Sequence, residues 1–413
     1  MLFECLSRRL SSLNCTESEM RICAVHAPDI TSHWPFALTC VVIIFTVLIS
    51  KNMLPFLARR NADVIHSEEN DSPISNDSRP PMVALKESNQ VYNDIQVSKI
   101  LIHPIKSCRG ISLQSCRYSP EGLENDRRFC IIDAVSHQVI TAREVSKMVM
   151  ITPRIEIDER SPHGGVLSIS FPEDSGSYES FSVPLYPIEE QWERLSDIGL
   201  WGKEVDGFVC ENQSSNGRSP STILSEFFER PVHLMVKGSR PRPCDPTNSF
   251  PGLKATTLYQ DGYPLLVLSE ESIDILHEEI RSRVGTQGIE DQWSKKKFVI
   301  ERFRPNIVLR GAGPFAEDNF EEISIGPGDP EITGGKQPGI LLVSKCVRCL
   351  LPNVCPDSGT RDKAVPYKVL MKFRIGLDPK NKMKPCVGCN GVPLGSGMIK
   401  VGDRVIVRRV IAA

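Results

Sequence analysis

The sequence predicts a mainly β chain, with a β-barrel or α+β fold, preceded by one N-terminal transmembrane helix. Short runs of β-branched and aromatic residues recur from Val97 to the C-terminus, and few helical patterns lie between them. Strands in series with few intervening helices favour a barrel or an α+β fold over a doubly wound sheet. An uncharged apolar run near the N-terminus, followed by a polar segment, adds the membrane helix.

Composition indicates an intracellular enzyme. The chain has 413 residues, of which 40% are hydrophobic, so it is long enough for two domains. A net charge of -2 argues against nucleic-acid binding, which usually requires a basic excess. The 14 cysteines are scattered, and Arg8, Arg9, Glu17 and Glu19 interrupt any early signal peptide. A reducing compartment is therefore expected, with most thiols acting as small buried hydrophobes.

The predicted membrane anchor spans residues 35–57. Its uncharged core, Phe36–Ser50, is shorter than the roughly 20 residues of a spanning helix, but the full segment is long enough if Lys51 snorkels. Arg59 and Arg60 add positive charge on the C-terminal side. By the positive-inside rule, the chain after this single pass lies in the cytosol.

The segments around the anchor carry no folding pattern. Residues 1–34 form an N-terminal tail, and residues 58–95 are acidic, rich in Ser, Asn and Pro, and poor in aromatic residues. Such a composition is typical of a disordered linker. Beyond it the sequence predicts strands, which are Ile100–Ile102, Phe129–Ile132, Gln138–Thr141, Val149–Ile155, Val166–Phe171, Asn306–Leu309, Ile340–Val343 and Ile399–Val410, the last interrupted by a turn at Gly402.

Capping residues and apolar periodicity predict two helices. The first spans Ser219–Arg230, where Ser219 is a suitable N-cap, Pro220 suits the first helical position and Pro231 ends the helix. The second spans about Ser269–Arg283, with an apolar stripe of Ile273, Leu276 and Ile280 along one face.

The C-terminal region holds two CxxC pairs, Cys346/Cys349 and Cys386/Cys389. Paired thiolates at this spacing can wrap one side of a tetrahedral zinc, so a four-cysteine zinc site is one interpretation. The gap between the pairs far exceeds the roughly 15 to 20 residues of a typical zinc ribbon. Arg348 provides a positive neighbour that would stabilise a Cys349 thiolate, which favours a cofactor pocket. Whether Cys386 and Cys389 bind a metal stays open.

Six motifs then amount to a family resemblance. In order they are HPIKSCRG (His103–Gly110), DRRF (Asp126–Phe129), RFRPNIVL (Arg302–Leu309), CVRC (Cys346–Cys349), PDSGTRD (Pro356–Asp362) and IKVGDRV (Ile399–Val405). The chain resembles MOSC-domain proteins over roughly residues 97–410, and among them the mitochondrial amidoxime-reducing component family. The resemblance implies an N-terminal β-barrel-like domain at 96–236 and a MOSC β-barrel domain at 237–413.

The resemblance also implies a Mo-molybdopterin cofactor, with Cys349 as the catalytic residue and the metal ligand. It assigns cofactor contacts to ten residues, which are Lys106, Ser107, Arg127, Asp261, Gly262, Tyr263, Arg304, Asn306, Arg348 and Asn390. The chemistry of the basic residues agrees, because the phosphate of molybdopterin needs fixed cations and donors. A soft thiolate likewise suits a metal that already has dithiolene sulfur ligands.

The function implied is an oxidoreductase that reduces N-hydroxylated compounds of amidoxime type. Its partners would be a cytochrome b5-type haem protein and an NADH-dependent reductase, besides the small substrate and the membrane, with no nucleic acid. The family resemblance places it at the mitochondrial outer membrane. Two alternatives stay open, a MOSC sulfur-carrier module of molybdenum-cofactor metabolism and a zinc-stabilised membrane scaffold.

Overall fold

The computed structural model describes residues 94–172, 178–187, 189, 191–211, 217–326 and 338–411. The chain divides into two units, Met1–Lys86 and Glu87–Ala413, and the described residues belong to the second. The predicted tail and anchor lie outside the described residues, as does the linker except for its last two positions. Within the described ranges, no helix is long and apolar enough to span a membrane.

A closed seven-stranded barrel forms the larger β-structure, which confirms the prediction of a mainly β fold. In order around the barrel, its strands are β15 (Ile307–Arg310), β14 (Leu265–Ser269), β18 (Cys386–Pro393), β17 (Gly339–Val347), β16 (Phe320–Gly326), β20 (Arg404–Val410) and β1 (Gln96–Ile102). β1 pairs with β15 as well as with β20, and this pairing closes the ring. Only β14 and β15 run parallel among the barrel pairs described.

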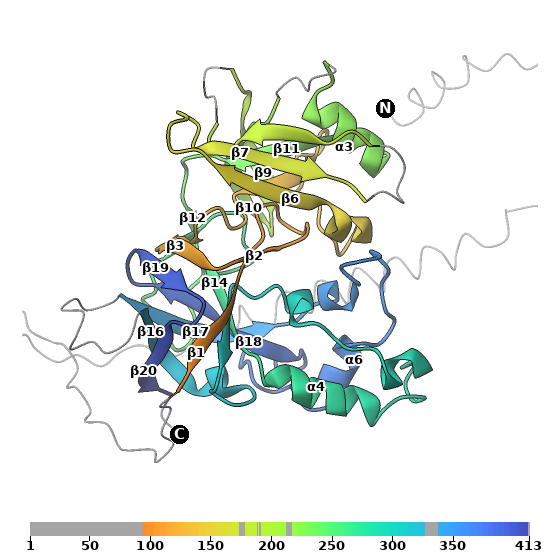
Figure 1. The fold of residues 1–413 in the computed structure, drawn as a ribbon, viewed down its shortest axis with the longest axis vertical. Helices are drawn as coiled ribbons and strands as arrows, with labels where there is room; N and C mark the ends of the chain where they lie inside the picture. The colour runs from red at the N-terminus through yellow and green to blue at the C-terminus, as the bar shows by residue number, and fades with distance from the viewer. Residues whose placement is uncertain are drawn as a thin grey trace, which may run out of the picture. The chain divides into compact units, whose positions relative to one another are not determined.

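The barrel is not continuous in sequence. Its first strand, β1, comes from the N-terminal end of the described chain, whereas the other six come after residue 264. In Figure 1 the orange β1 lies among the blue strands of the C-terminal region. β2 (Ile111–Leu113) pairs with the C-terminal half of β1, at Ile100–Ile102, and is the eighth strand of the sheet.

The strands between β2 and β14, together with β19 from the C-terminal region, form smaller antiparallel sheets. A four-stranded sheet has the order β5 (Phe129–Asp133), β11 (Val232–Lys237), β10 (Lys203–Val209) and β9 (Arg194–Leu200). A three-stranded sheet contains β6 (Thr152–Ile157), β7 (Gly165–Ser170) and β8 (Phe181–Pro184), and another joins β19 (Gly397–Lys400) to β3 (Ser115–Ser119) and β4 (Gly122–Leu123). β12 (Arg242–Pro243) pairs with β13 (Thr256–Thr257).

Three α-helices are described, α3 (Pro220–Phe228), α4 (Ser272–Arg281) and α6 (Tyr367–Leu370). The first confirms the predicted cap, because Ser219 Oγ accepts a hydrogen bond from the Thr222 backbone N–H at 3.3 Å. α4 confirms the second predicted helix, which begins three residues later than expected. Ser269 instead ends β14, where its backbone N–H and hydroxyl both donate to the buried Glu317 carboxylate.

Two strand predictions were wrong in part. Val149 and Met150 belong to the 3-10 helix η1 (Ser146–Met150), and the strand begins only at Thr152. The segment at 138–141 forms only isolated bridges, in which Val139 pairs with Ile132 and Gln138 with Gly199. β-branched residues in these segments fill a core rather than pair in a ladder, because Ile140, Val149 and Ile151 are buried in one hydrophobic cluster.

Candidate functional site

One cavity collects every residue that the sequence analysis assigned to a cofactor site. It is lined by Cys349 and by the ten predicted contacts, Lys106, Ser107, Arg127, Asp261, Gly262, Tyr263, Arg304, Asn306, Arg348 and Asn390. These residues come from the turn after β1, the turn before β5, the segment before β14, the link from η4 (Ile300–Phe303) to β15, the end of β17 and the middle of β18. Their shared cavity is a finding, and their binding role stays a prediction.

Three of the lining residues have left-handed backbone conformations. The φ angles are +69° at Ser107, +46° at Arg127 and +58° at Arg304. A side chain in this region costs roughly 1–2 kcal/mol, and such strain collects at ligand sites where the surrounding structure enforces it. The backbone at these three positions therefore lowers the stability of the fold and places the three residues in the cavity wall.

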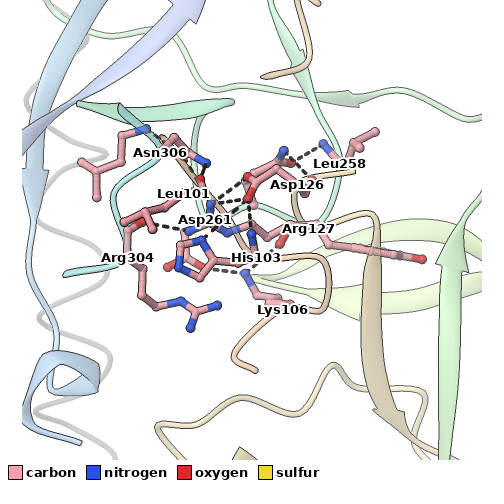
Figure 2. Close-up of polar contacts among 12 residues, drawn as sticks. Leu101, His103, Lys106, Asp126, Arg127, Leu258, Asp261, Arg304 and Asn306 are labelled. Atoms are coloured by element: carbon pink, nitrogen blue, oxygen red, sulfur yellow. Dashed lines mark hydrogen bonds and ion pairs between the residues drawn. The ribbon is translucent and has the colours of Figure 1, made fainter. Parts of the chain in front are cut away.

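A buried carboxylate orients one wall of the cavity. Asp126 accepts hydrogen bonds from the His103 backbone N–H at 2.8 Å and from Arg127 Nη1 at 2.7 Å (Figure 2). Although burial opposes it, the Arg127 charge lowers the pKa of Asp126, which stays ionised. Arg127 Nη1 also donates to Asn306 Oδ1 at 3.2 Å, and Asn306 Nδ2 donates to the Leu101 carbonyl. These bonds fix the positions of Arg127 and Asn306.

A second ion group lies at Asp261. Its carboxylate accepts hydrogen bonds from Lys106 Nζ at 2.5 Å and from Arg143 Nη2 at 3.2 Å. Although desolvation would raise it, these two cations lower the pKa of Asp261. Burial lowers the pKa of Lys106 even though Asp261 acts in the opposite direction. One carboxylate thus holds two cations at the cavity wall.

Two arginines among the predicted contacts keep unused donors, and Nε of the unpredicted Arg143 is unpartnered as well. Arg304 Nη1 donates to the Cys108 carbonyl at 2.6 Å, but its buried Nη2 has no hydrogen-bond partner. Arg348 Nη2 donates to the Phe303 carbonyl at 2.8 Å, and its buried Nε is also unpartnered. Burial and the nearby Arg127 charge lower the pKa of Arg304 to about 9. Unpartnered donors on crowded cations are the groups that an anionic ligand would satisfy.

Three further predicted contacts, Tyr263, Asn390 and Gly262, also line the cavity. Tyr263 donates its hydroxyl to the Asp245 carbonyl at 2.9 Å, and Asn390 Nδ2 donates to Ser344 Oγ at 3.0 Å. Gly262 has no atom within 4 Å of the position that a Cβ would take, so the cavity wall is open there.

Cys346 and Cys349 both line the cavity, but they differ in their contacts. Arg348 Nη1 lies 3.0 Å from Cys346 Sγ, whereas Cys349 Sγ accepts a long hydrogen bond, 3.5 Å, from the Leu351 backbone N–H. Arg348 therefore hydrogen-bonds Cys346, and its stabilisation of a Cys349 thiolate stays a prediction. β17 ends at Val347, and beyond it the chain turns so that the guanidinium folds back onto the last strand residues. Desolvation raises the pKa of Cys346 despite the Arg348 charge.

The second CxxC pair lies inside the barrel wall. Cys386 and Cys389 are 0% and 2% exposed, and Cys389 Sγ donates to the Glu317 carbonyl at 3.2 Å. Burial raises the pKa of Cys386 to about 12. Among the residues that the structure describes, no group of three or more Cys, His, Asp or Glu side chains has the arrangement of a metal site. The four cysteines therefore do not form the tetrahedral zinc site that their spacing allowed.

Several lining residues were missed by the sequence analysis, namely Thr141, Arg143, Trp201, Gln260, Leu265, Leu266, Phe303 and Leu351. Most carry no signal in the sequence, because their place in the wall depends on tertiary contacts. Trp201 is different, since a tryptophan directly before Gly202 in a strand–turn–strand pattern is an unusual turn residue. This unusual residue could have marked Trp201 as a candidate site residue from the sequence alone.

The donor set of the cavity fits the cofactor that the resemblance implies. Unpartnered guanidinium donors on Arg304 and Arg348 suit a phosphate, and a partly exposed thiol at Cys349 suits a soft metal. No acidic side chain other than Asp261 lines the cavity in the described residues, and that carboxylate is neutralised by Lys106 and Arg143.

Comparison with known proteins identifies two domains and a group of relatives. Residues 94–230 match the MOSC N-terminal beta barrel domain, and residues 254–406 match the MOSC domain. The chain is 29% identical to the mouse (Mus musculus) protein named mitochondrial amidoxime-reducing component 1 over 320 residues, which cover 75% of this chain and 81% of that protein. The Xenopus laevis protein of the same name is 28% identical over 75% of this chain and 81% of its own length. The human (Homo sapiens) protein of the same name is 27% identical over 75% of this chain and 82% of its own length.

Proposed function

This chain is a MOSC-domain protein similar to the mitochondrial amidoxime-reducing components, and we propose that it is a molybdenum-cofactor-dependent reductase of N-hydroxylated, amidoxime-type compounds. The observation that carries the proposal is the cavity in which Cys349 lies with Arg304 and Arg348, two cations that have unpartnered buried donors. Such a site suits an anionic group that also brings a soft metal.

The reaction requires two electrons and two protons. In it the N–O bond of R–NH–OH breaks, the nitrogen becomes R–NH₂ and the oxygen leaves as water. When bound, the molybdenum cofactor would supply the two-electron redox chemistry, which no side chain of the cavity can perform alone. The side chains bind and orient the reactants.

The thiol of Cys349 and the charged groups around it have distinct roles in this proposal. Cys349 would be the protein ligand to the metal, because a thiolate is a soft donor. Arg304 and Arg348 would hold the cofactor phosphate with their unpartnered N–H groups. The fixed pairs, Arg127 with Asp126 and Lys106 with Asp261, would keep the cationic wall in place without a change in ionisation near neutral pH.

The electron supply and the location are part of the same proposal. Electrons would come from a cytochrome b5-type haem protein that an NADH-dependent reductase keeps reduced. The predicted anchor at 35–57 would hold the chain to the mitochondrial outer membrane, with the catalytic part in the cytosol. The names of the relatives, which are mitochondrial components, support this location.

Metal and pterin analysis of the full chain, purified in detergent, tests the proposal. We expect molybdenum and a molybdopterin-derived pterin in about equal amounts, together with reduction of an amidoxime by a chemical reductant. Zinc in place of molybdenum, with no pterin and no reduction, would overturn the proposal and favour a scaffold. Molybdenum cofactor that carries a transferable sulfur, without reductase activity, would favour the sulfur-carrier alternative.

A further inference from the structure

Trp201 lies at the tip of the hairpin formed by β9 and β10. Leu200 pairs with Lys203, so Trp201 and Gly202 form a two-residue turn. Their φ angles are +54° and +75°, the two positive values of a type I′ turn. The first position of this turn strongly favours Asn, Asp or Gly, and a large side chain there is strained. The turn by itself would therefore not select tryptophan.

Trp201 forms part of the cavity wall, and the residue is 45% exposed. Arg143 lies over the ring, with Cζ 4.3 Å from the ring centroid, and Lys106 Nζ lies 5.4 Å from it. Asp261 binds both cations. The two cations and Asp261 thus hold the ring in place, while about half of the Trp201 surface stays accessible to solvent.

The other described tryptophans behave differently. Trp192 is 4% exposed and Trp293 is 1% exposed, and both belong to hydrophobic core clusters. A tryptophan that only filled space or shielded a salt bridge would be expected to bury its faces in the same way. Trp201 instead combines a strained backbone, two cations at its ring and an accessible surface in the cavity.

We propose that Trp201 is a specificity-determining residue, which stacks on a planar conjugated substituent of the N-hydroxylated substrate. This inference rests on the proposed function and adds to it a substrate class, aromatic over aliphatic amidoximes. A ring held by Arg143 and Lys106 is preorganised, so stacking costs little side-chain entropy. Flexible aliphatic substrates gain no such contact.

The test compares two substrates and two variants of the full-length holoprotein. Benzamidoxime and acetamidoxime carry the same reacting group with and without a ring. In Trp201→Asn, we expect the ratio of kcat/KM for benzamidoxime to that for acetamidoxime to fall about five-fold, mainly through KM. Because Asn suits the type I′ turn, the same variant should also melt about 2 °C higher. Trp201→Phe should retain most of the preference.

A matched control lies outside the cavity. Tyr186 is 39% exposed, and Arg128 lies 4.2 Å from its ring centroid, so Tyr186→Asn removes a similar cation–π pair that does not line the cavity. This substitution should leave the substrate ratio unchanged. A binding measurement is independent of turnover, because benzamidoxime should quench the fluorescence of the oxidised wild-type protein but not that of Trp201→Phe.

Three results would overturn the inference. An unchanged ratio in Trp201→Asn would mean that the ring has only a structural role. A loss of pterin in that variant would mean that the ring supports the cofactor rather than the substrate. Equal quenching in the wild-type protein and in Trp201→Phe would exclude stacking. If the wild-type protein reduced neither compound, the proposed function would fail, and quenching would still decide whether Trp201 stacks on a planar ligand.

Discussion

The two CxxC pairs have the same spacing and opposite environments. Cys346 and Cys349 straddle the end of β17 and line the cavity, whereas Cys386 and Cys389 lie within β18 and are buried. Burial raises the pKa of both thiols in β18. Since the thiolate is the form that binds metal, the buried pair is poorly suited to ligation. The comparison teaches that strand context, rather than spacing, decides what a CxxC pair can do.

The largest expected effect separates Cys349 from the buried pair. Cys349→Ser should lower amidoxime reduction by more than about 100-fold, because even losing an outer-shell partner costs 10- to 100-fold and this change removes the ligand itself. Cys386→Ser should retain molybdenum, pterin and activity in the folded fraction. Metal analysis beside steady-state kinetics measures both. Equal loss of metal in the two variants would contradict the distinction between the pairs.

The surroundings of the buried pair give a pH-dependent stability. Burial raises the pKa of Glu317, which accepts hydrogen bonds from Ser269, to about 7, so the folded protein favours its neutral form. This contribution is fully present below the ordinary pKa of a glutamate and is lost as the pH rises through about 7. Between pH 5 and pH 8 we expect a loss of about 2.5 kcal/mol in unfolding free energy.

The matched variant for this measurement is Glu317→Gln, which stays neutral at every pH. Denaturant unfolding should show that the stability of this variant is nearly flat over the same pH range, while its activity near neutral pH is retained. A slope equal to that of the wild-type protein would assign the pH dependence to other groups.

Two neighbouring arginines extend the comparison from thiols to cations. Arg304 keeps an unpartnered donor in the cavity, whereas Arg302 donates to the carbonyls of Asn353 and Val354 and is 6% exposed. Arg304→Ala should weaken pterin binding by about 1.5–3 kcal/mol, the worth of a hydrogen bond to a charged group. Arg302→Ala should instead lower the melting temperature, because it leaves two buried carbonyls unpaired. Normal pterin content in Arg304→Ala would make Arg304 a structural residue.

The smallest effect is expected at Cys346. Its contact with Arg348 can be replaced by a serine hydroxyl, which also accepts a hydrogen bond from the guanidinium. Cys346→Ser should therefore keep molybdenum and reduce activity only a few-fold, on the order of 1 kcal/mol. Loss of the metal in this variant would mean that both thiols of the cavity are ligands.

The sequence by itself determined the local features and part of the membership of the cavity. The capped helix α3 could be predicted because Ser219, Pro220 and Pro231 act within a few residues of one another. Seven of the eleven residues of the candidate site lie in four of the six motifs, and the family resemblance supplied the other four, Asp261, Gly262, Tyr263 and Asn390. These signals are either local in the chain or carried by the resemblance.

Only the tertiary structure decided how distant segments meet. β1 closes the barrel by pairing with β15, more than 200 residues away, and no local pattern fixes such a pairing or its register. The same long-range packing directs Arg348 to Cys346, brings Arg143 and Trp201 into the cavity wall and buries Cys386 and Cys389. Periodicity and spacing describe neighbours along the chain, whereas burial and charge contacts depend on which strands pack together, and for this reason the two cysteine pairs looked alike in sequence.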